Sequence, residues 1–363
     1  MANKIIPSFA NRSDPWKDGG KNRVFVLMSG GVDSSVTAYL LKKQGWDVAG
    51  ITMELLPQRK QEGGVSQAAE ICREMEMPHF FIDLKQEFYA SVVTPFRQAY
   101  EKGRTPNPCV ECNAHFKFGL LWDILEQHYA PAFHVATGHY ARCGTYEGHP
   151  FLGRALDRQK DQSYFLCRIA PKRIPKLVLP LGEYSKEQTR AIAAQAGLTV
   201  AEKKDSMEIC FAGEGDYRGL LNTKLQKGPI LNQEGVKLGE HQGISGYTLG
   251  QRKGLNISAP QPLYVVQILP EQNTLIVAPK EASFFCTVRA QAPNVLIPQL
   301  YTKTALLFGK IRSQGEPSPC KITYYDEEIL EVTFDTPVFA PAPGQTLALY
   351  SAEGHIVAGA TLH

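Results

Sequence analysis

The first half of the chain alternates between short apolar segments and longer segments in which apolar residues recur at helical spacing. The apolar segments predict four buried strands, at residues 23–28, 47–53, 79–82 and 133–136. Helical spacing predicts one helix that begins near residue 36 and four further helices at residues 65–75, 87–100, 116–129 and 185–196. The last of these begins with a capping box formed by Ser185 and Gln188. This alternation is typical of a parallel sheet with helices on both faces, so we expect an α/β domain over residues 21–205.

The pattern changes after about residue 205, where short strands separated by glycines become frequent. Three hairpins are predicted, at residues 262–279, 321–334 and 347–362. Short strands at this spacing are typical of a small barrel or sandwich. We therefore expect a small central domain over residues 206–280, a C-terminal β-barrel over residues 281–363 and a flexible tail at residues 1–20.

Composition narrows the class of protein without identifying it. The chain of 363 residues is long enough for two or three domains, and its 43% hydrophobic content is ordinary for globular proteins. A net charge of +3 does not by itself require a nucleic-acid partner. No apolar run reaches the roughly 18 residues of a membrane span, and the eight cysteines are spaced unlike a secreted disulfide framework. We therefore expect a cytoplasmic protein without a membrane partner.

The most informative chemical signal is the run from Ser29 to Ser35, which reads S-G-G-V-D-S-S. It lies between a predicted strand and a predicted helix. There, two glycines let backbone N–H groups approach an anion, and the helix start adds about half a positive charge. The run lacks the Walker and dinucleotide-binding patterns. It resembles instead the loop of the ATP pyrophosphatase superfamily, whose members cleave ATP to AMP and pyrophosphate, and Asp33 is then the expected partner of Mg²⁺.

Two further positions belong to the same expected nucleotide site. Met53 ends the second predicted strand, and Gly138 follows the fourth. Because the ligands of open parallel sheets sit beyond the carboxyl ends of the strands, we expect both positions to converge with the Ser29–Ser35 run on one nucleotide.

Two segments that contain cysteine carry the next signal. Cys109 and Cys112 form a C-x-x-C in a proline-rich loop, and Cys210 lies in the polar segment K-D-S-M-E-I-C-F. Cys112 precedes the helix predicted at residues 116–129, whose positive end would lower the thiol pKa. A C-x-x-C also holds metals, but a zinc site needs two further ligands and the sequence has no second C-x-x-C. The other cysteines are expected to be packed side chains: Cys72, Cys143, Cys167, Cys286 and Cys320.

A basic segment at residues 154–176 is the candidate for RNA binding. Its arginines and lysines outnumber its aspartates, and Tyr164 and Phe165 lie among them. Positive charge and aromatic rings suit phosphates and a stacked, unpaired base. Arg252 and Lys253, in the turn G-Q-R-K-G, form a second candidate.

Six motifs follow one another along the chain: S-G-G-V-D-S-S, T-P-N-P-C-V-E-C-N, T-G-H-Y-A-R, K-D-Q-S-Y-F-L, D-S-M-E-I-C-F and G-Q-R-K-G-L. From about residue 21 to its end, the chain with these motifs closely resembles the tRNA-specific 2-thiouridylase (MnmA) family. The resemblance implies an ATP pyrophosphatase (adenine nucleotide α-hydrolase-like) domain that binds ATP with Mg²⁺. It implies conversion of the wobble uridine of tRNA to 2-thiouridine, with AMP and pyrophosphate as products. It also implies a cysteine desulfurase or a sulfur-relay protein as the sulfur donor.

The resemblance assigns roles to individual positions as well. Cys112 matches the family's nucleophile and Cys210 matches the cysteine that carries a persulfide, so that sulfur transfer would pass through a disulfide bond. The positions that match ATP contacts are Leu27, Met28, Ser29, Gly30, Gly31, Val32, Asp33, Ser34, Met53 and Gly138. The positions that match tRNA contacts are Asn107, Pro108, Cys109, His139, Lys160, Asp161, Gln162, Arg312 and Gln345, of which the first three would touch the target base.

One position departs from the family pattern. Many relatives have an aspartate where this chain has Cys109, so a third thiol joins Cys112 and Cys210. Three thiolates with one open position suit an iron–sulfur cluster whose free iron binds sulfide, and related RNA-thiolating enzymes use such clusters. A persulfide relay without a cluster is the other mechanism that these cysteines allow.

Three other functions fit part of the sequence. An ATP pyrophosphatase that amidates or ligates a small molecule would explain the Ser29–Ser35 run but not the cysteine segments. An RNA thiolase that acts on another position is a second alternative. Only the resemblance of the C-terminal β domain and of the G-Q-R-K-G turn to the MnmA family argues against it. A non-enzymatic RNA-binding metalloprotein would use the C-x-x-C structurally and would turn over no ATP.

Overall fold

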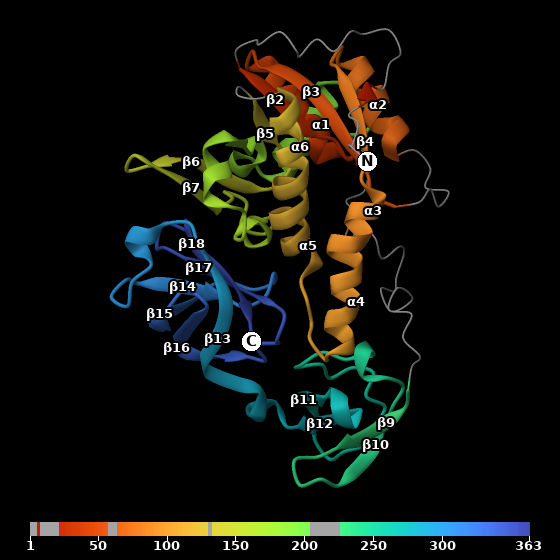
Figure 1. The fold of residues 1–363 in the computed structure, drawn as a ribbon, viewed down its shortest axis with the longest axis vertical. Coiled ribbons are helices and arrows are strands. Elements are labelled where there is room, and N and C mark those ends of the chain that lie inside the picture. Colours follow the sequence, from red (N-terminus) through yellow and green to blue (C-terminus); the bar gives the residue numbers. More distant parts are fainter. Residues whose placement is uncertain (1–5, 8–21, 57–63, 130–132, 204–225) are drawn as a thin grey trace. The chain divides into compact units, whose positions relative to one another are not determined.

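The computed structural model describes residues 6–7, 22–56, 64–129, 133–203 and 226–363. The chain forms two compact units (Figure 1). The first unit contains residues 1–91, 111–207 and 354–356, and the second contains residues 92–110, 208–353 and 357–363. Each unit therefore combines segments that are far apart in the sequence.

The first unit is built on a sheet with the strand order β1-β4-β3-β2-β5-β8. Its strands are β1 (Ile6–Pro7), β2 (Arg23–Leu27), β3 (Asp47–Glu54), β4 (His79–Asp83), β5 (His134–Ala136) and β8 (Leu177–Val178). All pairs are parallel except β1 with β4, which confirms the expected parallel sheet. Of the tail expected at residues 1–20, only Ile6–Pro7 is described, as β1, and the other residues lie outside the described part of the chain.

The sheet and its first helix share one apolar core. The helices of this unit include α1 (Val32–Lys43), α2 (Gly64–Glu74), α3 (Lys85–Phe88), α6 (Leu121–Tyr129) and α7 (Lys186–Gln195). Strand β2 lies between β3 and β5, and Val24 and Val26 are fully buried with Val36 and Leu41 of α1. Each such side chain contributes about 1.5–3 kcal/mol on burial, so the core fixes where β2 ends and α1 begins. The capping box predicted at Ser185 and Gln188 is present at the start of α7.

The helix expected at residues 116–129 begins earlier than the sequence pattern indicated. It starts with α5 (Pro108–Glu111), continues as a π-helical segment (Cys112–Leu120) and ends with α6. Asn107 Oδ1 accepts the backbone N–H of Val110 at 3.3 Å, so Asn107 caps a helix whose first residue is a proline, an arrangement that suits proline's fixed φ. Preceding it, α3, a π-helical turn (Tyr89–Val93) and α4 (Thr94–Glu101) follow one another without a break. No helix within the described ranges is both long enough and apolar enough to cross a lipid bilayer.

A hairpin of the first unit was not expected from the sequence. Strands β6 (Ala141–Tyr146) and β7 (His149–Arg154) pair antiparallel around Glu147 and Gly148, which have φ angles of 50° and 80°. Positive φ at both central residues is the signature of a two-residue hairpin turn. Short 3₁₀ helices follow, at Ser163–Leu166, Pro171–Lys176 and Pro180–Glu183.

The second unit holds two β structures. A four-stranded sheet has the order β10-β9-β12-β11, with β9 (Gly228–Leu231), β10 (Lys237–His241), β11 (Tyr264–Leu269) and β12 (Thr274–Ala278). A closed barrel has the order β13-β16-β15-β14-β17-β18. Its strands are β13 (Phe284–Val295), β14 (Leu307–Lys310), β15 (Ser318–Tyr325), β16 (Ile329–Phe339), β17 (Thr346–Tyr350) and β18 (Ile356–Leu362). The predicted C-terminal β-barrel and the three predicted hairpins are confirmed.

Candidate functional site

The S-G-G-V-D-S-S run forms the loop between β2 and α1, at the point where the strand order of the sheet reverses. The chain proceeds from β2 to β3 and β4 on one side, and later to β5 and β8 on the other. In open parallel sheets this reversal creates the crevice in which ligands bind. Gly138 follows β5 and packs directly on the loop, since a Cβ at this glycine would lie 2.8 Å from the backbone nitrogen of Ser34. Half-buried Met53 lies on the other side of β2, near the end of β3.

The first turn of α1 leaves backbone donors open for an anion. Gly30 has a φ of +72°, which favours glycine, and Gly31 is the N-cap of α1. Among the described residues no side chain makes a capping hydrogen bond there, so the N–H groups of the first helical turn have no partner within the helix. Ser35 Oγ donates instead to the carbonyl of Gly31 at 2.8 Å, and Ser29 and Ser34 hydroxyls pair at 3.2 Å. The result is an anion cradle made of backbone and hydroxyl groups.

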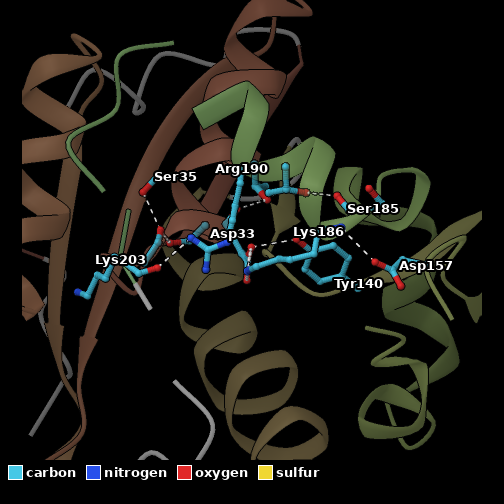
Figure 2. Close-up of polar contacts among 12 residues, drawn as sticks. Asp33, Ser35, Tyr140, Asp157, Ser185, Lys186, Arg190 and Lys203 are labelled. Atoms are coloured by element: carbon cyan, nitrogen blue, oxygen red, sulfur yellow. Dashed lines mark hydrogen bonds and ion pairs between the residues drawn. The ribbon is translucent and has the colours of Figure 1, made fainter. Parts of the chain in front are cut away.

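Asp33 lies in the first turn of α1 and is the centre of a polar network (Figure 2). Lys186 Nζ lies 2.7 Å and 2.9 Å from its two carboxylate oxygens, and Tyr140 donates its hydroxyl to Oδ1 at 3.0 Å. The Asp33 side chain is 34% exposed, whereas that of Lys186 is only 11% exposed. Sequence analysis missed Lys186. The available signal was a lysine in the first turn of a helix, where the helix dipole disfavours a cation.

A second ammonium group reaches the same loop. Lys203 Nζ donates to the carbonyl of Gly30 at 3.2 Å and to Gln67 Oε1 at 2.6 Å. Arg190 of α7 in turn donates to the carbonyl of Lys203 at 3.1 Å (Figure 2). Two lysines from outside the motif thus bring positive charge to the anion cradle.

The segment with the tRNA-matched residues Lys160, Asp161 and Gln162 is a tightly bonded turn. The Asp161 side chain is 2% exposed and accepts from Arg154 Nε at 3.3 Å and from the backbone N–H groups at 155 and 163. Gln162 Oε1 accepts the backbone N–H of Tyr140 at 3.0 Å. The side chains of Asp161 and Gln162 therefore stabilise the turn by accepting backbone N–H groups. The positively charged side chain of Lys160 is half-buried.

His139 follows Gly138 and is a neutral imidazole in this setting. Its Nδ1 lies 2.7 Å from Thr137 Oγ1, and its ring faces that of Phe118 at a centroid distance of 6.4 Å. Burial, assisted by the charge of Lys117, lowers the pKa of His139 to about 3. The side chain can therefore hydrogen-bond or pack against a base, but it supplies no positive charge near neutral pH.

Cys112 is buried within the π-helical segment, so it does not lie just before a helix start as expected. Its neighbour Asn113 is 2% exposed and donates Nδ2 to the carbonyl of Phe165 at 3.0 Å. The Asn113 Oδ1 atom has no hydrogen-bond partner within the described part of the chain. A buried polar atom without a partner is costly, and π-helical turns are frequent at functional sites. This segment is therefore a candidate for ligand contact.

The remaining cysteines divide by exposure. Burial raises the pKa of the thiols of Cys72, Cys167 and Cys320 to about 12, which fits the expected packed, unreactive side chains. Cys143 is half-buried, and Cys286 is exposed, so the expectation of a packed side chain was wrong for Cys286. Cys109 is half-buried, and Cys210 lies outside the described residues. In the described ranges, no group of three or more His, Cys, Asp or Glu side chains is placed to hold a metal ion.

The basic segment at residues 154–176 is less available to RNA than its composition suggested. Tyr164 is fully buried, so the expectation of a stacking ring was wrong for this residue. Arg168 pairs with Glu111 at 2.5 Å, and buried Arg173 pairs with Glu126 at 2.7 Å. These arginines are paired with carboxylates of the same unit, which a count of charges along the sequence does not reveal.

In the second unit, two other tRNA-matched residues make internal contacts. Gln345 Nε2 donates to the carbonyl of Thr105 at 2.8 Å, and the N–H of Thr105 donates to the carbonyl of Pro343 at 2.8 Å. Arg312 donates to the carbonyls of Leu249 and Ala340, at 3.1 Å and 2.8 Å. The barrel thus anchors the segment that leads into Asn107, Pro108 and Cys109.

Comparison with known proteins places this arrangement in a family. A family model described as the tRNA methyl transferase HUP domain matches residues 22–214. The tRNA methyl transferase PRC-barrel domain matches residues 220–279, and the aminomethyltransferase beta-barrel domain matches residues 284–362. The tRNA-specific 2-thiouridylase MnmA 1 of Clostridium tetani is 39% identical over 341 residues, which cover 91% of this chain and 94% of that protein. The chain belongs to the tRNA-specific 2-thiouridylase (MnmA) family.

Other members of the MnmA family match over a similar extent. The tRNA-specific 2-thiouridylase MnmA of Syntrophomonas wolfei is 38% identical over 345 residues, which cover 94% of this chain and 100% of that protein. Among solved structures, a tRNA thiolase from Methanococcus maripaludis with its iron–sulfur cluster is 19% identical, with a TM-score of 0.35. That match covers 55% of this chain and 64% of the other.

The MnmA-matched positions fall into two groups in the structure. Those assigned to ATP lie in the first unit, at the carboxyl ends of β2, β3 and β5. Those assigned to tRNA are divided between the units: His139 and Lys160–Gln162 belong to the first, and Asn107–Cys109, Arg312 and Gln345 belong to the second.

Proposed function

We propose that the protein is a tRNA-specific 2-thiouridylase that activates the C2 oxygen of the wobble uridine with ATP and replaces it with sulfur. The observation that carries the proposal is the anion cradle at the reversal point of the sheet, in a chain that belongs to the MnmA family. The cradle fits a polyphosphate, because its donors are backbone N–H groups, hydroxyls and two lysines.

The residues around the loop suit ATP and its metal ion. Gly30, Gly31 and the first turn of α1 would bind the phosphates, with Met53 and Gly138 beside them. Asp33 offers a partly exposed carboxylate, the oxygen ligand that Mg²⁺ prefers, so the residues present fit this ion. When bound, Mg²⁺ neutralises charge on the phosphates during cleavage.

The first chemical step makes the uracil oxygen a leaving group. The C2 oxygen attacks the α-phosphorus of ATP, which forms adenylated uridine and releases pyrophosphate. Without this step the oxygen would have to leave as oxide, which is a very poor leaving group. The cradle holds the departing pyrophosphate through donors that are already in place before the reaction.

The second step is sulfur transfer, which we propose to run as a persulfide relay. The terminal sulfur of a Cys210 persulfide attacks C2 and displaces AMP. The Cys112 thiolate then attacks the Cys210 sulfur, so that 2-thiouridine is released and a Cys112–Cys210 disulfide forms. A thiol reductant must return both cysteines to thiols, and a cysteine desulfurase or sulfur-relay protein must supply the next persulfide.

An iron–sulfur cluster is the alternative to the relay at Cys109, Cys112 and Cys210. The described residues supply two of these three thiols, so no step is assigned to a cluster here. In the relay, Cys109 would be a residue beside the target base, together with Asn107 and Pro108. Iron content decides between the two mechanisms.

For tRNA, we propose contacts at Lys160 and His139 in the first unit and at Arg312 and Gln345 in the second. Lys160 would meet phosphate, whereas neutral His139 would meet a base. We place the reaction in the cytoplasm, where reduced thiols persist.

Pyrophosphate release tests the activation step. With ATP, release should require tRNA and should not respond to ammonia or to an amino acid, which would be the substrates of an amidating ligase. Asp33→Ala should abolish this release while tRNA binding persists. The control is Asp47→Ala, which lies at the amino end of β3, away from the strand ends that form the nucleotide site, and should behave as the unmodified protein. Normal ATP cleavage by Asp33→Ala would contradict the role given to the loop.

A further inference from the structure

Lys186 is a buried lysine whose Nζ contacts both carboxylate oxygens of Asp33. Its Nζ lies over the ring of Tyr140, 5.7 Å from the ring centroid. Its backbone N–H donates to Asp157 Oδ2 at 3.0 Å, and the Ser185 capping box fixes the start of α7 (Figure 2). The ammonium group therefore lies at the edge of the anion cradle, on a helix whose start is fixed.

Binding of ATP with a metal ion would change the charge balance around Lys186. Asp33 neutralises the buried ammonium in this structure, but the same carboxylate is the group that fits Mg²⁺. If Asp33 turns to a metal ion, the ammonium loses the charge of that carboxylate, and breaking a buried ion pair is destabilising. The polyphosphate that arrives with the metal ion supplies a new anion.

Geometry puts that anion within reach of the ammonium group. Asp33 lies in the first turn of α1, and its own N–H is one of the donors of the cradle. Because Lys186 Nζ touches the side chain of this residue, a phosphate bound to the first-turn N–H groups lies beside the ammonium. No signal in the S-G-G-V-D-S-S run itself predicts this contact.

We propose that Lys186 is a ligand of the pyrophosphate portion of ATP, and that its ion pair with Asp33 is the resting state of that phosphate site. When the metal ion and the phosphates bind, the Lys186 ammonium leaves Asp33 and contacts phosphate, and the Asp33 carboxylate contacts the metal ion. The inference rests on the proposed use of ATP, but it concerns pyrophosphate binding and needs no tRNA.

A competing explanation is that Lys186 only neutralises Asp33. The two explanations differ once Asp33 has no charge. If Lys186 binds phosphate, it still contributes to pyrophosphate affinity in the Asp33→Asn background. If it only neutralises Asp33, its replacement in that background has no effect.

The experiment measures binding of inorganic pyrophosphate by calorimetry, in EDTA and then with Mg²⁺, and binding of adenosine as a control without phosphate. The variants are Lys186→Met, Lys186→Arg, Asp33→Asn and the double variant of Asp33→Asn with Lys186→Met. Lys43→Met is the matched control, because this exposed lysine lies at the opposite end of α1.

Lys186→Met should weaken pyrophosphate binding in EDTA by about tenfold or more, while adenosine binding stays within about twofold. The same loss should appear when the double variant is compared with Asp33→Asn alone. Lys186→Arg should retain most of the affinity, and Lys43→Met should match the unmodified protein.

Unchanged pyrophosphate affinity in Lys186→Met would overturn the proposal, as would equal affinities of the double variant and Asp33→Asn. A parallel loss of adenosine binding would also overturn it, because Lys186 would then act on the fold of the loop. If pyrophosphate binding follows the proposal but no tRNA is thiolated, the proposed function fails while this inference stands.

Discussion

Three of the cysteines differ in their surroundings. Cys112 is buried and precedes Asn113, whose Oδ1 has no hydrogen-bond partner among the described residues, whereas Cys109 is half-buried and Cys286 is exposed on β13. The proposed reaction uses only Cys109, Cys112 and Cys210. Cys112→Ser and Cys210→Ser should therefore abolish 2-thiouridine formation, with ATP still consumed in the presence of tRNA by Cys210→Ser.

The control for these variants is Cys286→Ser, which removes a thiol of the barrel and should leave thiolation unchanged. Formation of 2-thiouridine at the normal rate by Cys210→Ser would show that another group carries the sulfur. Cys109→Ser separates the mechanisms. If it loses bound iron and activity together, a cluster is present, and if iron-free protein thiolates at the full rate, the relay holds.

Single residues of the site were predictable to different degrees. The Ser29–Ser35 run predicts its own geometry, because glycines and hydroxyl residues between a strand and a helix are typical of an anion-binding turn. For Lys186 the sequence offers one local signal, a lysine in the first turn of a helix, but its contact with Asp33 forms only after α7 has docked against α1. Arg173 and Tyr164 were misjudged, since burial depends on packing partners that a local pattern does not contain.

At the scale of the elements, the pair of β3 and β4 contains a titrating group. His79 of β4 is 2% exposed, and its Nε2 lies 2.8 Å from Thr52 Oγ1 of β3. Burial lowers the pKa of His79 from 6.5 to about 4. Below pH 6.5 the unfolded chain binds a proton at this position that the folded chain does not bind, so stability is full above pH 6.5 and is lost as the pH falls toward 4.

At pH 5 this residue should cost roughly 2 kcal/mol of unfolding free energy relative to pH 7. Urea unfolding of the unmodified protein and of His79→Gln at both pH values measures the effect. The variant should lose that part of the pH dependence, whereas His149→Gln, on the exposed hairpin strand β7, should retain it. An identical pH dependence in His79→Gln would show that His79 is not the group responsible.

Elements were easier to predict than their limits. The apolar runs of β2, β3 and β4 and the capping box of α7 carry local signals, and the structure contains all of them. The start of the helix at Pro108 was missed because Pro106, Asn107 and Pro108 are typical of a loop, whereas here Asn107 caps a helix that begins at the second proline. The β6–β7 hairpin was missed because its turn has a glutamate where asparagine or aspartate is usual.

At the scale of the whole molecule, contacts between distant segments position the segment that leads into Asn107–Cys109. The hydrogen bond from Gln345 to the carbonyl of Thr105 joins residues separated by 240 positions within the second unit. Gln345→Leu would leave that carbonyl without this donor and loosen the segment. Thiolation should fall by about tenfold at subsaturating tRNA, while pyrophosphate affinity stays unchanged.

The matched control is Gln314→Leu, which alters an exposed glutamine of the same unit. Equal activities of Gln345→Leu and Gln314→Leu would contradict the anchoring role. No sequence pattern links Gln345 to Thr105, because the contact depends on how the barrel closes. For this reason the order of domains could be predicted from the sequence, but the contacts that join their segments could not.

The most direct test of the central claim is mass analysis of the wobble nucleoside of tRNA after incubation with the protein, ATP and a persulfide donor. The account predicts 2-thiouridine at that position, formed only when all three are present and accompanied by AMP and pyrophosphate. Unmodified uridine under these conditions, thiolation at a different position, or formation of 2-thiouridine without ATP would contradict it.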